Sequence, residues 1–196
     1  MAGRTASARP YLQNTDNQTT THGVFSHVRS TQEERLRIHV RWMIRRDMRE
    51  VLGVEQEAFE FPWSDEDFTR CLRQRNCIGM VAESGDSVVA FMIYELHRSR
   101  LHVLNFAVAR SHRRLGVATR MMEKLIGKLT PERRNRIVLE VRETNLPAQL
   151  FFRSLGFRAI SVLKDFYQDT TEDAYLMHYS ALAAVGEQVV PQRMAG

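Results

Sequence analysis

Arginine and glycine residues cluster in one turn of the sequence in a way that could bind an anion. The segment NFAVARSHRRLGVATRMMEKL runs from a strand pattern, through a turn with Arg113, Arg114 and Gly116, into a helical pattern. A helix N-terminus presents unpaired N–H groups and partial positive charge, and Gly116 and Ala118 leave room for a phosphate. Arg113, Arg114 and Arg120 would add full charges, although the glycine could equally serve only to close the turn. The common nucleotide-binding motifs GxGxxG and GxxxxGKS/T are absent.

Glu140 is a carboxylate placed where it could exchange a proton. It lies in the apolar segment IVLEV, where an unpaired charge is costly unless it is partnered or functional. Alternation along a strand would instead point it to solvent, and the residues alone favour that second interpretation. His102 and His112 have no carboxylate or cysteine at the spacing of a metal site. We therefore expect His102 to pack within a strand, His112 to lie on the turn surface, and no metal to be bound.

Hydrophobic periodicity predicts the elements that would carry these residues. Alternating apolar residues predict strands, whereas apolar residues three or four apart predict helices. Ser64 or Asp65 and Asn145 are expected helix caps, and Gly85 supplies the positive φ of a hairpin turn. In chain order we expect a strand at 36–42, helices at 48–58 and 65–75, strands at 78–83, 87–96 and 101–109, a helix at 115–129, a strand at 137–141, a helix at 145–155, and strands at 157–163 and 173–182. Together they indicate one mixed α/β sheet with helices on its faces.

Composition limits the class of protein. The chain has 196 residues, of which 43% are hydrophobic and 26% charged, as expected for one globular domain with tails. No apolar run approaches the roughly 20 residues of a membrane span, and residues 1–30 lack the apolar core of a secretory signal. We expect a disordered leader at 1–34, a folded domain at 35–182 and a tail at 183–196. Cys71 and Cys77 show no disulfide or zinc pattern, which favours a cytoplasmic protein with reduced thiols.

The charge excess lies in the folded part of the chain. The net charge is +5, from 28 basic and 23 acidic residues, and both tails are neutral. This distribution is not that of a basic arm that binds nucleic acid. It favours a local anionic ligand or an acidic partner.

The motif R-x-x-G-x-A at residues 113–118 resembles the pyrophosphate-binding motif of the Gcn5-related N-acetyltransferase (GNAT) family, whose members hold acetyl-coenzyme A (acetyl-CoA) there. Other segments are similar to the RimI-type branch: EQEAFEFPWSDEDF (55–68), NFAV (105–108), LEVRETNLPAQLFFRSLGF (139–157) and DFYQDTTEDAYLM (165–177). The resemblance runs from the first predicted strand to the last and includes neither tail. It implies a single GNAT-like α/β domain with a mixed, mostly antiparallel central sheet, splayed mid-sheet strands, and helices on both faces.

The resemblance also implies acetyl-CoA as cosubstrate. The pantetheine arm would lie between the splayed strands and bond to the backbone of Phe106, Ala107 and Val108. Asn145 would contact the cofactor near its thioester, although a helix cap is the alternative role for this residue. The implied pyrophosphate contacts are Arg113, Arg114, Leu115, Gly116, Val117, Ala118 and Thr119.

By the same resemblance, Glu140 matches the general base that takes a proton from the acceptor amine. The family's usual general acid is a tyrosine, but Phe152 stands at the matching position and has no proton to donate. Tyr167 matches a second family tyrosine at the acceptor mouth and is the expected substitute, with solvent as the alternative and an exposed loop tyrosine as the simpler explanation. The acceptor slot would lie between residues 61–63 and 164–173, although Phe61, Pro62 and Trp63 could equally staple the second helix.

The function implied is direct transfer of an acetyl group to a protein N-terminus, namely the N-terminal alanine of a small-subunit ribosomal protein. No metal, membrane or direct nucleic-acid partner is expected, and the oligomeric state is left open. One alternative is a GNAT enzyme that acts on another amine, such as lysine or a small molecule. The other is a non-catalytic acyl-CoA- or ribosome-binding module, suggested by Phe152 and the basic segment RRNR at 133–136.

Overall fold

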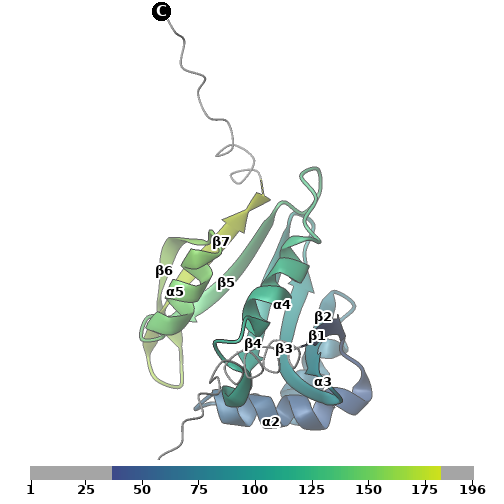
Figure 1. Ribbon diagram of the computed structural model, residues 1–196. Coiled ribbons are helices and arrows are strands. Elements are labelled where there is room, and N and C mark those ends of the chain that lie inside the picture. The colour runs from purple at the N-terminus through teal and green to yellow at the C-terminus, as the bar shows by residue number, and fades with distance from the viewer. Residues whose placement is uncertain (1–36, 182–196) are drawn as a thin grey trace, which may run out of the picture. The chain divides into compact units, whose positions relative to one another are not determined.

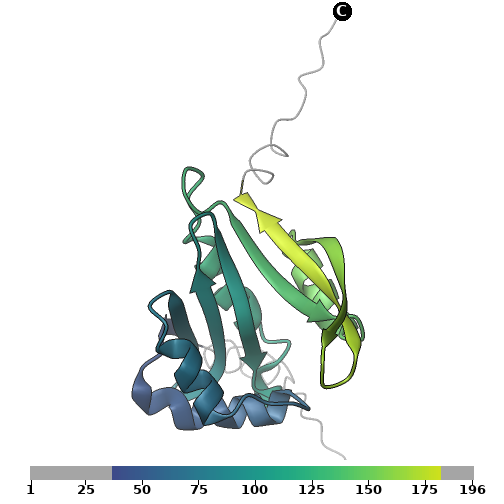
Figure 2. The same ribbon diagram turned by 180° about the vertical axis from the view of Figure 1, so that it is seen from behind.

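The described part of the chain, residues 37–181 of a computed structural model, is built around one seven-stranded sheet (Figures 1 and 2). The expected leader at 1–34 and tail at 183–196 lie outside the described residues. The strand order is β1-β2-β3-β4-β5-β7-β6, and only β4 and β5 run parallel. The elements are β1 (Ile38–Trp42), η1 (Arg45–Asp47), α2 (Met48–Ala58), α3 (Asp65–Leu72), β2 (Cys77–Ser84), β3 (Ser87–Leu96), β4 (Arg100–Val108), η2 (Arg110–His112), α4 (Val117–Ile126), β5 (Arg136–Arg142), α5 (Leu146–Ser154), β6 (Arg158–Tyr167) and β7 (Glu172–Ser180).

The predicted elements are all present, and their boundaries differ where local chemistry ends or extends them. Ser64 caps α3 by accepting a hydrogen bond from the N–H of Asp67, and Gly85 has a φ of 62°, as predicted. The helix expected to reach residue 129 ends at Ile126, with Gly127 as its C-cap. The strand expected to end at Leu163 continues to Tyr167. None of the described helices is long and apolar enough to cross a bilayer.

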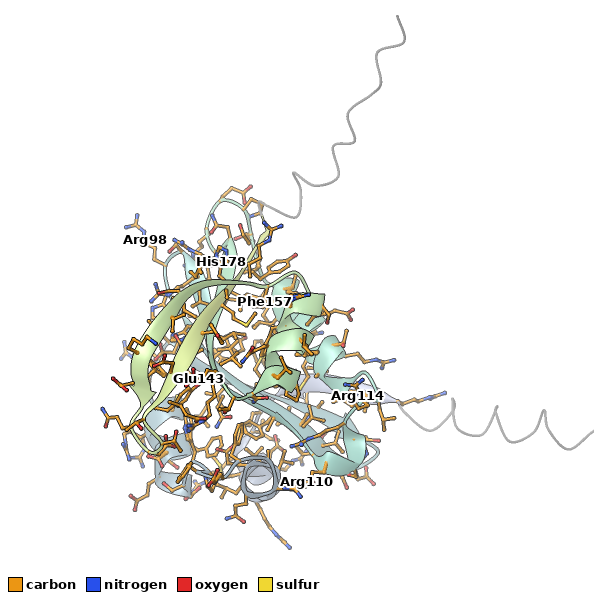
Figure 3. All side chains as sticks on the ribbon, turned by 90° about the vertical axis from the view of Figure 1, so that its left-hand side faces the viewer. Arg98, Arg110, Arg114, Glu143, Phe157 and His178 are labelled. Atoms are coloured by element: carbon orange, nitrogen blue, oxygen red, sulfur yellow. The ribbon has the colours of Figure 1, made fainter. Side chains whose placement is uncertain are left out.

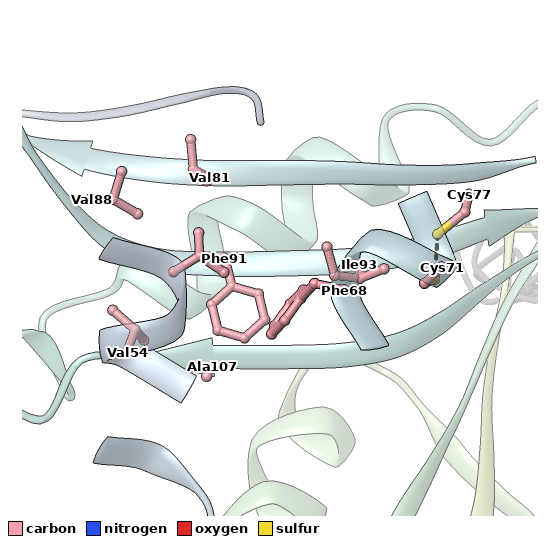
Figure 4. Close-up of a cluster of buried hydrophobic side chains, with 10 residues drawn as sticks. Val54, Phe68, Cys71, Cys77, Val81, Val88, Phe91, Ile93 and Ala107 are labelled. Carbon is pink, nitrogen blue, oxygen red and sulfur yellow. Dashed lines mark hydrogen bonds between the residues drawn. The ribbon is translucent and has the colours of Figure 1, made fainter. Parts of the chain in front are cut away.

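Helices cover both faces of the sheet. Figures 1 and 2 show α2 and α3 on one face and α4 and α5 on the other. Under α2 and α3, Phe68 packs edge-on against Phe91 with ring centroids 5.5 Å apart, beside Val54 (Figure 4). Burial of each such side chain contributes about 1.5–3 kcal/mol. Met121 and Leu125 of α4 are also fully buried, so both layers are anchored to the sheet.

The sheet splits between its two parallel strands. The ladder between β4 and β5 runs from Arg100 opposite Arg136 to Val103 opposite Leu139, and pairing ends there although both strands continue. Leu104 is an extra residue in β4, since Ile93 pairs with Asn105 and Tyr94 with Val103. Such a bulge bends its strand, which accounts for the divergence visible in Figures 1 and 2. The expected mid-sheet splay is thus confirmed.

Candidate functional site

A pocket of about 420 Å³ opens where β4 and β5 diverge. Its walls come from α2, the segment after α2, β4, β5, α5 and the end of β6. The lining residues are Glu55, Phe59, Phe61, Trp63, Val103, Leu104, Asn105, Phe106, Leu139, Glu140, Val141, Arg142, Asn145, Ala148, Phe152, Tyr167 and Asp169. Segments more than 100 residues apart in the sequence therefore share one cavity.

Glu140 lies in this pocket and is paired with a histidine. Its side chain is 16% exposed, and its Oε2 lies 2.8 Å from Nε2 of His102 on β4. An ionised carboxylate has no proton to donate, so the His102 ring is the donor in this bond. The open-solvent interpretation of Glu140 was wrong, because parallel pairing of β4 with β5 sets His102 opposite Val138, on the same face of the sheet as Glu140. His102 packs on its strand as expected, with a hydrogen-bond partner that the sequence did not reveal.

The expectation that His102 has no carboxylate at metal spacing was also wrong. Glu95, His97 and His102 each offer a donor atom, and the three atoms lie within 4.8 Å of one another. The β3–β4 hairpin creates this proximity, since Glu95 and His102 are opposite each other in the ladder.

Tyr167 lies at the end of β6 and not in an exposed loop. Leu163 pairs with Ala174 and Tyr167 pairs with Glu172, so β6 has two more residues than β7 between these two pairs. Asp165, within this bulge of β6, has a left-handed φ of 50°. The irregularity carries the ring of Tyr167 into the pocket. Burial there raises the pKa of Tyr167 to about 12, so its hydroxyl keeps its proton at neutral pH.

Arg142 holds Tyr167 in place. Its guanidinium lies 3.9 Å from the centroid of the Tyr167 ring and forms 2.6 Å ion pairs with Asp169 and Glu172. Glu172 also accepts a 2.6 Å hydrogen bond from the hydroxyl of Thr144. The bonds from Thr144, Arg142 and Thr170 lower the pKa of Glu172 to about 2. Carboxylates thus neutralise the charge of Arg142, and its planar group serves as a platform for the tyrosine.

Phe152 and Asn145 both line the pocket. Phe152 is 7% exposed and packs against Phe151 and Phe157, with ring centroids 5.1 and 5.4 Å away. Its position in the pocket therefore lacks a hydroxyl. Asn145 caps α5, because its Oδ1 accepts a 3.1 Å hydrogen bond from the N–H of Ala148. The cap role is confirmed, and it is compatible with a place in the pocket wall.

The arginine-rich turn lies at the start of α4 with an unusual backbone. Arg114 and Gly116 have left-handed φ values of 63° and 79°, and α4 begins at the next residue. A Cβ on Gly116 would meet nothing within 4 Å, so the turn faces open space. Figure 3 shows Arg114 at the outside of the molecule. Left-handed residues before a helix start orient several N–H groups outward, which is the geometry of an anion site.

The other expected cofactor residues surround this turn. Arg113 donates from Nε to the carbonyl of Val108 at 3.0 Å, and Arg120 donates from Nη1 to the carbonyl of Ile38 at 3.4 Å. Both side chains are thus partly engaged with backbone. Phe106, Ala107 and Val108 pair with β3 on one side, while their other edge faces the splay. The remaining predicted residues, Leu115, Val117, Ala118 and Thr119, lie in the turn and the first turn of α4.

A buried carboxyl that the sequence analysis missed links three walls of the pocket. Glu55 is 1% exposed, and its Oε1 accepts hydrogen bonds from the N–H of Trp63 at 2.7 Å and from Asn105 at 3.1 Å. Its Oε2 and the Oδ1 of Asn105 are buried without a hydrogen-bond partner in the described structure. Burial raises the pKa of Glu55. The sequence does indicate that Glu55 is buried, since it lies four residues after Val51, on the apolar face of α2.

The aromatic segment after α2 contacts both α3 and the pocket. Trp63 packs edge-on against Phe68 with centroids 5.3 Å apart, which confirms the expected staple at the start of α3, whereas contact with an acceptor stays a prediction. Phe59 and Phe61 are partly exposed and line the pocket.

Cys71 of α3 and Cys77 of β2 are buried with their Sγ atoms 2.6 Å apart (Figure 4), and burial raises the pKa of both thiols. Neither thiol lines the pocket.

The sequence of this chain is similar to those of a known protein family and of its characterised members. The model of the acetyltransferase (GNAT) family matches residues 45–157. The ribosomal protein bS18-alanine N-acetyltransferase of Escherichia coli K12 is 29% identical over 133 residues, which are 67% of this chain and 89% of that protein.

Solved structures share the fold. The crystal structure of the ribosomal-protein-S18-alanine N-acetyltransferase from Escherichia coli matches with a TM-score of 0.67 and 23% identity, over 81% of this chain and 99% of that one. Arabidopsis thaliana NAA60 in complex with acetyl-CoA matches with a TM-score of 0.66 and 16% identity, over 73% and 99% of the two chains.

Proposed function

Because the chain belongs to the acetyltransferase (GNAT) family and is an acetyl-CoA-dependent N-acetyltransferase, we propose that its acceptor is the α-amino group of a protein, namely the N-terminal alanine of a small-subunit ribosomal protein. The similarity to the bS18-alanine N-acetyltransferase supports this acceptor class. An acceptor of this kind requires the protein to act in the cytoplasm.

The observation that carries the proposal is the Glu140–His102 pair in a pocket at the splay. An α-ammonium group has a pKa of about 7.7–8.0 and must lose a proton before its nitrogen can attack a carbonyl. Glu140 is the proposed acceptor of this proton, directly or through a water. The Nε2–H of His102 orients the carboxylate and leaves its other oxygen available.

The cosubstrate site is proposed beside this pair. Residues 114–119 would hold the pyrophosphate with backbone N–H groups, and the edge of β4 at 106–108 would bond to the pantetheine arm. The fit rests on the left-handed turn, on the open space at Gly116 and on the edge of β4 that faces the splay. Acetyl-CoA supplies the acetyl group as a thioester.

Tyr167 is the proposed proton donor to the leaving sulfur. Its hydroxyl is protonated at neutral pH, it lines the same pocket as Glu140, and Arg142 fixes its ring. The substitution of Phe152 for the usual tyrosine is what leaves this role to Tyr167. Because Asp169 and Glu172 pair with Arg142, the guanidinium in the pocket wall does not repel a cationic amine.

Peptides that differ in a single feature test the acceptor. The purified chain is incubated with acetyl-CoA and peptides that begin with Ala, Ser, Met or Gly, and with an N-terminally blocked peptide that contains an internal lysine. We expect mass spectrometry to find acetylation of the α-amine, fastest on the Ala peptide. Preferred acetylation of the blocked peptide would establish lysine as the acceptor instead. Small-subunit ribosomal proteins from cells with and without this protein identify the natural target.

A further inference from the structure

Three side chains that could ligate a metal ion, Glu95, His97 and His102, lie together beside Glu140, and two of them, Glu95 and His97, take no part in the proposed reaction. Glu95 is near the end of β3, His97 directly follows that strand, and His102 faces Glu95 across the hairpin. Nε2 of His97 lies 3.0 Å from Oε2 of Glu95, and the two imidazole rings are 6.1 Å apart. Neither Glu95 nor His97 lines the pocket.

The chemistry of this donor set suits a zinc-class ion. Two imidazoles and one carboxylate are the ligands that Zn²⁺ takes in open three-ligand sites, with a solvent molecule in the fourth position. Bond lengths of about 2.0–2.2 Å put tetrahedral donors about 3.3 Å apart. The donor atoms here lie within 4.8 Å of one another, so rotation of side chains is enough to close the site.

The site is accessible, and its backbone is held. The side chains of His97, Glu95 and His102 are 34%, 19% and 20% exposed, so an ion can enter from solvent. The N–H of His97 donates to the carbonyl of Arg100 at 3.0 Å, and its carbonyl accepts a 2.8 Å hydrogen bond from Nε of Arg134. The hairpin therefore keeps His97 near His102 without an ion.

We propose that Glu95, His97 and His102 form a binding site for Zn²⁺ and that its occupancy inhibits acetyl transfer. His102 already donates from Nε2 to Glu140, and metal-bound histidines commonly donate their second N–H to a carboxylate. Closing the donor set around an ion requires the His102 ring to turn, and that turn moves the N–H that holds the Glu140 carboxylate in place. The inhibition rests on the proposed role of Glu140, whereas the binding of Zn²⁺ does not.

Binding of Zn²⁺ is measured first, in the absence of acetyl-CoA and peptide. Metal-free full-length chain is titrated with ZnCl₂ by calorimetry, and with CoCl₂ to record the absorption of tetrahedral Co²⁺. We expect one ion per chain, and at least about tenfold weaker binding in His97→Ala and Glu95→Gln because each removes one of three ligands. His39→Ala is the matched control, since His39 also pairs with a glutamate, Glu83, at 3.4 Å. Absence of binding, or equal binding by His97→Ala, would overturn the site.

Inhibition is then measured on the N-terminal peptide by mass spectrometry, because the thiol of released coenzyme A itself binds Zn²⁺. We expect Zn²⁺ to slow the wild-type chain, EDTA to reverse the effect, and His97→Ala to keep the metal-free rate while resisting Zn²⁺. A wild-type rate unchanged at saturating Zn²⁺ would refute the coupling. Absence of turnover without metal would count against the proposed function, while the titration still decides the metal site.

Discussion

The turn at residues 113–119 and the pocket around Glu140 are built in opposite ways. The turn is one continuous segment, and its shape comes from two left-handed residues and the start of α4. The pocket is assembled from α2, β4, β5, α5 and β6, and its polar groups bond to partners on other elements. The shape of the turn is therefore set by its own backbone, whereas the shape of the pocket is set by the packing of several elements on the sheet.

Because the two regions are built differently, substitutions in each should affect a different part of the proposed reaction. Changes in the turn should alter the affinity for acetyl-CoA and leave proton transfer intact. Changes in the proposed proton-transfer groups of the pocket should alter turnover and leave that affinity intact. Four variants, each with a control of the same chemical type, test this separation.

Glu140→Gln should have the largest effect. The amide keeps the shape of the side chain and cannot accept a proton, so we expect kcat to fall about 10²-fold or more. Calorimetry should find the affinity for acetyl-CoA unchanged. Glu143→Gln, an exposed change three residues further on, is the control and should keep the wild-type rate. A wild-type rate in Glu140→Gln would remove Glu140 from the base role.

Gly116→Glu tests the turn. A carboxylate in the open space at Gly116 would repel the pyrophosphate, and we expect acetyl-CoA to bind about 10- to 100-fold more weakly, or 1.4–2.7 kcal/mol. The left-handed backbone alone costs a non-glycine residue about 1–2 kcal/mol of stability. Gly85→Glu is the matched control, because Gly85 is also left-handed and faces open space. Equal affinities for the two variants would refute the turn as the phosphate site.

Tyr167→Phe tests the proposed acid. We expect kcat to fall about tenfold or more, with KM for the peptide little changed. Phe152→Tyr added to this variant should recover part of the rate, because it returns a hydroxyl to the pocket. Tyr175→Phe on β7 is the control. A rate within about twofold of wild type would leave solvent as the proton source, and a raised KM alone would make Tyr167 a peptide contact.

Glu55→Gln should have the smallest effect, on stability. Burial raises the pKa of Glu55, so the folded chain holds a proton at pH values where the unfolded chain has lost it. Stability therefore falls as pH rises above about 4.3, the ordinary glutamate pKa. The glutamine removes this dependence and can donate to Oδ1 of Asn105. We expect the variant to gain about 1 kcal/mol at pH 7–8 and nothing near pH 4.

Urea unfolding from pH 4 to pH 8 measures this gain. Exposed Glu60→Gln is the control, because it removes one surface carboxylate of the segment that follows α2 and leaves Glu55 in place. A Glu55→Gln variant that is less stable than wild type at pH 8 would show that Glu55 is charged in the folded chain.

The local features of this protein were predictable because their causes are local. Periodicity predicted each strand and α-helix but not the short 3-10 helices η1 and η2, and cap residues such as Ser64 and Asn145 form the hydrogen bonds that their types favour. The GNAT motif at residues 113–118 predicted a family that the comparisons confirmed. The end of β6 was the main error, because Tyr167 is carried into the pocket by a strand irregularity that depends on pairing with β7.

By itself, the sequence determined the order of the elements, the turn before α4 and the family, since each depends on residues within a few turns of one another. Only the tertiary structure decided the partners within the pocket. Glu140 meets His102 from 38 residues away, and Glu55 meets Asn105 from 50. The first contact depends on the pairing of β4 with β5, and the second depends on the packing of α2 against β4. Burial then determines how such groups ionise, and no spacing in a linear pattern carries that information.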